Sequence, residues 1–454
     1  MIRLRSVLRP SRRPASWLLG LLALISFSGC KLSEVFALHG PQSTYLTGGP
    51  VAKSQWDLFM VTVYVTFGIF VVVGSVLAYA TLKFRARSKD DEQVEVQQGH
   101  GHPLVEVTLV AGSALLLVII AVPTLRGIWY THDVPEDEKG SAIDVTATGY
   151  QWWFKFEYPS EHIALPGGGE GTLATANELV VPAGVPIRVQ LRTMDVIHSF
   201  WLPKLAGKVD MIPNRGNFLW FKADKPGYFY GQCAEYCGDS HAIMRFRVVA
   251  LPPSKYVAWL DNQKQNARTA TAGAIAAEGA QTQVKFASMT MPAVGPGSTL
   301  AGDAAFDADP LAAWLAKQQP APHEDPALIA RGHNLFGEKT CSNCHTIRGH
   351  GLKNASGQLS PYGGITAPEL THVGARSTIA AGVLENTPER MSQWLHDPEY
   401  FKPGNKMVHG IGGMAGYYKL EDGKILVENG RPVRNIVLND DEINALVAYL
   451  QSLK

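Results

Sequence analysis

Cysteine is scarce in this sequence, and neither sign of charge is in clear excess. The 454 residues contain five cysteines and carry a formal net charge of +1. A small disulfide-stapled secreted domain needs a denser cysteine framework, and a nucleic-acid-binding protein normally shows a basic surplus. The composition therefore argues against both classes. The length exceeds that of one ordinary core, so we expect two or three folded domains.

One cysteine, Cys30, ends an N-terminal segment that has the features of a secretory signal. Five arginines precede an apolar run over residues 18–27, and the small residues Ser28 and Gly29 follow it. The pattern resembles a bacterial lipoprotein signal, so we expect residues 1–29 to be removed and Cys30 to carry lipid. An ordinary signal peptide, or an uncleaved anchor helix with an incidental cysteine, is the alternative.

Two long apolar segments predict a transmembrane hairpin within residues 30–135. Residues 58–82 and 107–125 contain no charged side chain, and each reaches the ~20 residues that span a hydrocarbon core. Buried helices of a large soluble protein rarely run this long without a charge. Four basic residues separate the segments, and the positive-inside tendency places them in the cytoplasm. Everything after Thr131 is therefore expected on the outer, periplasmic side of a bacterial cell membrane.

Short alternating runs, punctuated by proline and glycine, predict an all-β sandwich over residues 140–255. Alternation of apolar and polar residues is typical of strands that are half-buried. The expected strands run at 142–148, 179–181, 187–191, 218–221 and 246–249.

A cluster of soft donors within this region predicts a metal site. Its members are His198, Cys233, Cys237, His241 and Met244. Thiolate, imidazole and thioether suit copper or zinc, not magnesium or calcium. A mononuclear blue-copper site needs one cysteine, two histidines and a weak axial methionine, so the second cysteine is surplus.

Two bridging thiolates and two histidines suit two copper ions, each of which takes one histidine. Met244 would then be a weak axial ligand to one copper, and the backbone carbonyl of Glu235 would serve the other. Zinc bound by the two cysteines and two histidines is the alternative, although zinc does not need Met244.

Residues 256–324 have the composition of a flexible linker. They are small and polar, then rich in proline and glycine, with one short helix expected near 310–317. A tether of this kind keeps two modules at high effective concentration.

The last 130 residues, 325–454, contain a c-type haem attachment pattern, Cys341-Ser342-Asn343-Cys344-His345. The two thiols add to the haem vinyl groups, and the adjacent His345 lies under the iron as an axial ligand. A thioredoxin-like redox pair is the alternative, but no βαβ context surrounds the motif. Helices are expected at 326–339, at 388–396 and after a capping box formed by Asn439 and Glu442, which predicts an all-α domain.

A large part of the sequence resembles a known family. Over roughly residues 50–255 it is similar to subunit II of cytochrome c oxidase, which carries the binuclear CuA centre in a cupredoxin-like sandwich. The matching segments are 231–238, 195–201, 151–153, 210–215 and the pattern Glu106…Pro123-Thr124-Leu125-Arg126. Quinol oxidase subunits share this fold and lack the copper ligands, so the ligands present here argue against quinol.

The resemblance implies roles for three further side chains. Trp152 would be the aromatic through which electrons reach the copper, with core packing as the alternative. Glu235 would help to hold a magnesium ion at the boundary with subunit I. Glu106 would mark the cytoplasmic mouth of a proton path, or else only begin a membrane helix in contact with water. Trp153 and Phe154 depart from the family pattern, so the match is looser there.

The C-terminal domain resembles a class I cytochrome c. The segment 394–407 is similar to the one that carries the second axial ligand, which implies Met407, with Met414 as the alternative. Pro368 resembles the proline that packs by the haem histidine. A His/Met pair raises the haem potential, as electron transfer toward oxygen requires.

Together these resemblances imply subunit II of a respiratory cytochrome c oxidase with a built-in cytochrome c. It would accept electrons at haem c from cytochrome c or a quinol–cytochrome c reductase, and pass them through CuA to the haem-copper centre of subunit I, with subunit III as a further partner. Oxygen would be reduced to water with proton translocation. The alternatives are a nitric-oxide-reducing complex, a free-standing electron carrier and a copper chaperone; the membrane hairpin argues against the second and covalent haem against the third.

Overall fold

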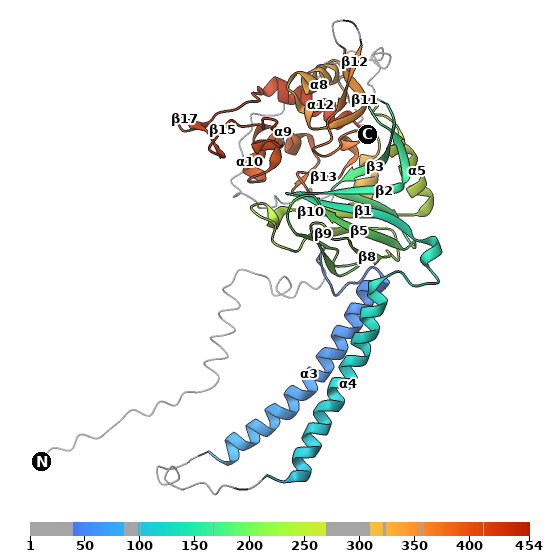
Figure 1. The fold of residues 1–454 in the computed structure, drawn as a ribbon, viewed down its shortest axis with the longest axis vertical. Coiled ribbons are helices and arrows are strands. Elements are labelled where there is room, and N and C mark those ends of the chain that lie inside the picture. Colours follow the sequence, from blue (N-terminus) through green and yellow to red (C-terminus); the bar gives the residue numbers. More distant parts are fainter. Residues whose placement is uncertain are drawn as a thin grey trace, which may run out of the picture.

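The computed structural model describes residues 40–85, 99, 101–166, 168–268, 309–320, 324–353, 356, 358–411 and 413–454. It shows three parts: a pair of long helices, a β-sandwich at one end of them, and a helical domain on the sandwich (Figure 1). The predicted signal segment and Cys30 lie outside the described residues.

The two apolar segments form the helices α3 (Pro50–Lys83) and α4 (Pro103–His132). Both are longer than the uncharged cores from which they were predicted, and each begins with a proline, which the first turn of a helix tolerates. Their most apolar windows have mean hydropathies of 2.3 and 2.5 and are not buried against any described part of the chain. Two such helices, lying side by side, have the length and composition of a membrane hairpin (Figure 1).

Both helices adjoin the sandwich, α3 at its first residues and α4 at its last ones. Before α3, the backbone N–H of Gly48 donates to the Lys204 carbonyl at 2.7 Å. Near the end of α4, the indole N–H of Trp220 donates to the Tyr130 carbonyl at 3.1 Å. These contacts fix where the hairpin leaves the sandwich.

The sandwich, residues 143–251, consists of two sheets of five strands each among the described residues. In the first, the order is β3 (Glu170–Ala176), β2 (Trp153–Ala164), β1 (Ile143–Tyr150), β5 (Ile187–Thr193) and β8 (Asn217–Phe221). In the second, the order is β4 (Glu178–Pro182), β10 (Arg245–Leu251), β9 (Gly227–Cys233), β6 (His198–Trp201) and β7 (Lys208–Met211). All five predicted strands are present; β1 pairs in parallel with β5, and β10 with β4.

Four phenylalanines form the centre of the sandwich core. Phe154 and Phe156 come from the first sheet, and Phe200 and Phe246 from the second, all fully buried. The Phe200 and Phe246 rings lie 4.5 Å apart, centroid to centroid, and Phe154 lies 4.9 Å from Phe246. The core therefore fixes β6 and β10 beside the metal donors, since His198 and Met244 each lie two residues before one of these rings.

The linker prediction is wrong at its start. Residues 256–264 belong to the helix α5 (Pro253–Lys264), which buries Tyr256, Trp259 and Leu260. The Trp259 ring packs 5.8 Å from that of Tyr158 in β2. Apolar burial, not a tether, therefore follows the last strand. The short helix expected at 310–317 is α7 (Pro310–Lys317), and its Trp314 is 1 % exposed.

The helical domain, residues 325–454, has the three expected helices. They are α8 (Pro326–Glu338), α9 (Pro388–His396) and α12 (Asp440–Ser452). The capping box of Asn439 and Glu442 forms in full at the start of α12. Gly332 lets α8 approach the backbone of α12, where any Cβ would overlap the Ala445 carbonyl.

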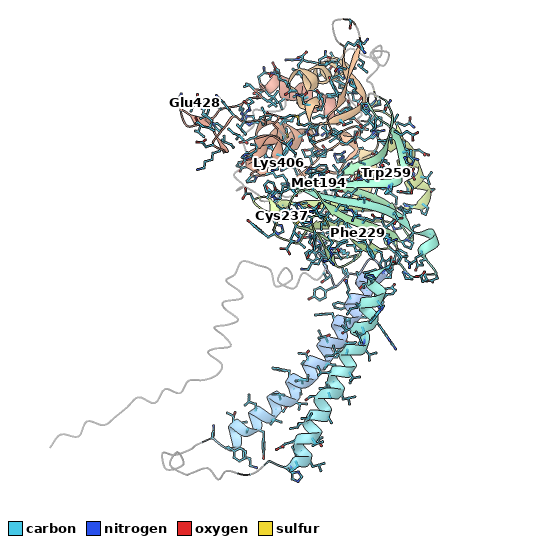
Figure 2. All side chains as sticks on the ribbon, in the orientation of Figure 1. Met194, Phe229, Cys237, Trp259, Lys406 and Glu428 are labelled. Atoms are coloured by element: carbon cyan, nitrogen blue, oxygen red, sulfur yellow. The ribbon has the colours of Figure 1, made fainter. Side chains whose placement is uncertain are left out.

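Shorter elements complete this domain. Two small helices follow α9, and the domain also has small two-stranded sheets that were not expected from the sequence. These elements are α10 (Pro398–Phe401), α11 (Lys406–His409), β11 (Thr346–Lys353), β12 (Leu359–Gly363), β13 (Thr378–Ile379), β14 (Leu384–Glu385), β15 (Leu420–Glu421), β16 (Lys424–Ile425), β17 (Val427–Glu428) and β18 (Arg431–Pro432). The hairpins β15–β18 project from the domain, with Glu428 at the outer end (Figures 1 and 2).

Candidate copper and haem centres

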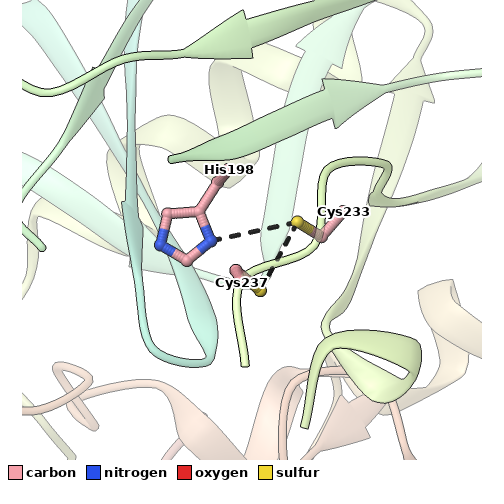
Figure 3. A group of neighbouring side chains, drawn as sticks. All are labelled: His198, Cys233 and Cys237. Carbon is pink, nitrogen blue, oxygen red and sulfur yellow. Dashed lines mark hydrogen bonds between the residues drawn. The ribbon is translucent and has the colours of Figure 1, made fainter. Parts of the chain in front are cut away.

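The predicted metal donors converge at one end of the sandwich. His198 begins β6, Cys233 ends β9, and the chain then turns back through residues 233–244, called the copper loop below. A single 3-10 turn, His241–Ile243, sits inside this loop and ends at Met244, immediately before β10. Donors from a distant strand and from one loop are thereby brought together (Figure 3).

The distances define a compact group of sulfur and nitrogen atoms. The two sulfurs, Cys233 Sγ and Cys237 Sγ, are 3.8 Å apart. Nδ1 of His198 lies 3.9 Å from the first sulfur, and Nδ1 of His241 lies 3.6 Å from the second. The Met244 thioether is 3.8 Å from Cys237 Sγ. Each thiol therefore has its own imidazole.

This donor set fits two copper ions better than one metal. Two thiols, two imidazoles and a thioether are more donors than one blue-copper ion takes, and each sulfur has its own histidine beside it. The carbonyl of Glu235 lies 3.2 Å from Cys233 Sγ as an additional oxygen. The group His198, Cys233 and Cys237 is buried, as a desolvated redox centre requires.

Two side chains orient the metal donors, and both lie in segments that carry the family resemblance. The carboxylate of Asp195 accepts from His198 Nε2 at 2.8 Å, which leaves Nδ1 facing the sulfurs. Although burial opposes it, hydrogen bonds from His198 and two backbone N–H groups lower the pKa of Asp195. The Gln151 amide donates to the Cys237 carbonyl at 2.8 Å.

In this pair of thiols, one proton is lost easily and the other is retained between the two sulfurs. The hydrogen bond between the sulfurs, aided by His198, lowers the pKa of Cys233 to about 3. The same neighbour raises the pKa of Cys237, because a second thiolate would sit beside the first. A bound cation removes that repulsion, so the pair is built to hold positive charge.

The haem attachment motif follows α8. Cys341 opens a 3-10 turn, Cys341–Asn343, and Cys344 and His345 come directly after it. Nδ1 of His345 donates to the Pro368 carbonyl at 2.7 Å, so that Nε2 is the nitrogen left for iron. Burial raises the pKa of Cys341 to about 12, which is of no consequence once the sulfur is alkylated.

Next to this motif lies a cavity of about 500 Å³. Its walls are mostly apolar and include both cysteines, His345 and Pro368. Volume and lining suit a flat apolar group held by two thioethers, which is what haem c is. Met407 and Met414 both line the cavity, so the choice of sixth ligand stays a prediction. Met407 also packs against the core of the domain.

The cavity reaches the sandwich, since Trp152 forms part of its wall. Trp152 is 5 % exposed and belongs to the sandwich core, and its indole N–H donates to the Cys237 carbonyl at 3.0 Å. One aromatic ring therefore touches the copper loop and borders the haem cavity. Figure 2 labels Cys237 on the sandwich and Lys406 on the neighbouring helical domain. Glu106 lies far away, exposed in the first turn of α4.

A buried carboxylate joins the sandwich, α7 and the helical domain. Glu178 accepts from the Trp314 indole at 2.9 Å and from the backbone N–H of Ser377 at 3.0 Å, and also from the Ser377 hydroxyl. On its other side, α7 is held to the helical domain by Gln318, whose amide donates to the Ala375 carbonyl at 2.9 Å. The helix α7 is therefore a brace between the two domains.

Replacing Glu178 by alanine is expected to destabilise the docked domains by on the order of 3 kcal/mol, because two buried N–H donors lose their acceptor. Glu178→Gln keeps one acceptor oxygen and should lose about half as much. Denaturant unfolding of the detergent-solubilised chain, followed by haem absorbance, measures both. Equal denaturant midpoints of unfolding for wild type and Glu178→Ala would show that this carboxylate does not stabilise the docked domains.

The fold and the paired centres define a membrane-anchored electron-transfer subunit. Residues 143–251 match the family described as cytochrome C oxidase subunit II, periplasmic domain, and residues 329–454 match cytochrome c. Similar proteins include cytochrome c oxidase subunit 2 of Alkalihalophilus pseudofirmus (29 % identical, covering 89 % of each chain) and that of Cereibacter sphaeroides (30 %, covering 54 % of this chain and 88 % of the relative). A quinol oxidase subunit 2 of Bacillus anthracis is 28 % identical over 55 % of this chain and 80 % of its own.

The chain belongs to the cytochrome c oxidase subunit II family, in the form with a cytochrome c domain fused at the C-terminus. It is a membrane-anchored subunit of a cytochrome c oxidase complex, with a copper site and a haem c domain.

Proposed function

We propose that this chain accepts electrons at a haem c and passes them to a binuclear copper centre, and from there to the haem-copper centre of subunit I. Oxygen is reduced to water there, coupled to proton translocation. Cys341, Cys344 and His345 hold the haem, with Met407 as the sixth ligand. The copper ligands are His198, Cys233, Glu235 (by its carbonyl), Cys237, His241 and Met244. Each bound group supplies a one-electron redox couple.

The observation that carries this proposal is the position of Trp152. Its indole donates to Cys237 in the copper loop, and its ring borders the cavity beside His345. One side chain of this chain thus contacts the copper loop and borders the haem cavity, so the two centres are held next to each other. Asp195 fixes the tautomer of His198, and Pro368 fixes that of His345.

The orientation of the chain in the membrane is part of the same proposal. The sandwich and the helical domain lie on the periplasmic side, because basic residues occupy the loop between α3 and α4. Glu106, in the first turn of α4, then faces the cytoplasm, where it offers a carboxylate at the mouth of a proton path. The carboxylate of Glu235 is available for magnesium at the boundary with subunit I.

The wider assembly is also part of the proposal. Subunit III is a further partner, and cytochrome c or a quinol–cytochrome c reductase is the external donor. Residues 1–29 are a signal, and Cys30 is the lipidated first residue of the mature chain, followed by the hairpin to residue 135. The sandwich and the haem domain then occupy 140–255 and 325–454.

An electron paramagnetic resonance spectrum of the full chain tests the proposal most directly. The chain is purified in detergent without subunit I, with haem attached and copper loaded, and then oxidised. We expect a seven-line copper pattern, because one unpaired electron is shared by two copper nuclei. A four-line pattern, or no copper signal in a chain that has bound zinc, would contradict the binuclear centre.

A further inference from the structure

Three successive residues of the helical domain lie against the copper loop. They form the segment 402–404, called the docking segment below, between α10 and α11. Nζ of Lys402 donates to the Ile243 carbonyl at 3.3 Å, and the carbonyl of Pro403 accepts from the Ser240 hydroxyl at 2.6 Å. Ile243 and Ser240 stand among the predicted copper ligands of that loop.

The third residue, Gly404, faces the ring of Trp152. A Cβ placed on Gly404 would lie 3.0 Å from Cη2 of Trp152 and 3.0 Å from Oδ2 of Asp239, closer than a side chain normally comes. Gly404 also has a φ of +73°, which favours glycine. Its N–H donates to the carboxylate of Glu399 at 3.0 Å, so the backbone is held in this position.

The docking segment continues directly into the wall of the haem cavity. Asn405 caps the next helix, α11, by accepting from the Val408 N–H at 3.1 Å, and this helix carries Met407. Lys402 and Asn405 are 4 % and 5 % exposed, so the junction is buried from one domain to the other. A single stretch of backbone therefore touches the copper loop and positions the predicted haem ligand.

A second set of contacts holds the same two domains together elsewhere. The N–H of Arg245 donates to the Ala381 carbonyl at 3.0 Å, and the guanidinium of Arg247 donates to the Gly382 carbonyl at 3.1 Å. Together with the hydrogen bonds accepted by Glu178, these contacts hold the two domains together at several separate places. The helical domain is thus seated on the sandwich as a fixed body.

We propose that the docking segment sets the position of the haem domain on Trp152 and thereby the rate at which electrons pass from haem c to the copper centre. The proposal rests on the proposed function. Gly404 is a positioning residue: it sets how closely the haem domain approaches Trp152 and does not itself carry the electron. Because the partner domain is already in place, electron transfer between the centres should not depend on ionic strength.

The test compares Gly404→Ala with Gly423→Ala in the full chain, haem-matured, copper-loaded and in detergent. Gly423 has a φ of +75° and open space around it, so it reports the backbone strain alone. After pulsed one-electron reduction of haem c, we expect the rate of copper reduction to fall severalfold in Gly404→Ala, because the added methyl group pushes against Trp152 and Asp239, each 3.0 Å from its position. It should also become sensitive to salt, whereas Gly423→Ala keeps the wild-type rate.

The copper and haem spectra of both variants serve as the check on folding. If Gly404→Ala loses either the copper or the haem, Lys402→Met is used as the test variant in its place. This substitution removes the hydrogen bond to the Ile243 carbonyl and keeps the apolar part of the side chain. The rate of copper reduction is then expected to fall about threefold. Wild-type rates in a folded variant would overturn the docking role while leaving the proposed function intact. A wild-type chain in which haem c never reduces the copper would overturn the proposed function itself.

Discussion

Replacing Cys233 by serine will stop electron transfer from haem c to subunit I and leave the haem c spectrum unchanged. The sulfur of Cys233 lies between Cys237 and His198, at 3.8 and 3.9 Å, and a serine oxygen is too hard a donor to bridge two copper ions. Oxidase turnover should fall by more than about 100-fold, since losing even an outer partner of a metal ligand costs 10–100-fold. The haem motif is untouched by the change.

Met244→Leu is the matched control for this experiment. Leucine is similar in size to methionine, so this substitution removes only the thioether sulfur, which lies 3.8 Å from Cys237 Sγ in the same buried loop. Both thiols and both histidines stay in place. The seven-line copper pattern should persist in Met244→Leu, with a shifted reduction potential, and disappear in Cys233→Ser. Normal turnover in the serine variant would mean that electrons reach subunit I without the copper centre.

Met407→Leu should lower the reduction potential of haem c by on the order of 0.1 V or more, because a thioether ligand holds that potential high. Met414→Leu is its natural counterpart, since both methionines line the same cavity and the substitution conserves volume. Redox titration of the haem absorbance in the purified chain measures both variants.

The two variants give opposite answers for the two candidates. A fall in Met407→Leu with an unchanged Met414→Leu assigns the sixth ligand to Met407, whose helix continues from the docking segment. The reverse result would move the ligand to Met414 and separate the docking segment from the iron. The His345–Pro368 hydrogen bond, at 2.7 Å, should be preserved in both, so the proximal side serves as an internal constant.

The copper loop was predictable because its chemistry is local. Four of its donors lie within twelve residues, and their types alone select soft metals. The contacts that dock the domains were not predictable, because each joins distant segments: Trp314 reaches Glu178 across 136 positions, Lys402 reaches Ile243 across 159, and Ser377 reaches Glu178 across 199. No composition or periodicity encodes such pairs.

Other misses had signals in the sequence. In α5, the residues Tyr256, Trp259, Leu260 and Gln263 repeat at helical spacing on one buried face, a pattern hidden by averaging the composition of the whole stretch. The hairpins β15–β16 and β17–β18 turn at Asp422-Gly423 and Asn429-Gly430, and all four residues have positive φ. Such pairs are typical of two-residue hairpin turns. Their strands are two residues long, too short for alternation to show.

The anchored positions of α5 and α7 also have a consequence for how a fused chain of this kind can change in evolution. The guanidinium of Arg268 binds the Glu324 carboxylate at 2.5 Å and the Ser452 carbonyl at 3.3 Å, while Asp309 caps α7 by accepting from the Ala312 N–H at 3.0 Å. The described chain is thus anchored both at Arg268 and at Asp309. A change in the number of residues between these two positions, in evolution or by an inserted peptide tag, therefore leaves the spacing of the two redox centres as it is.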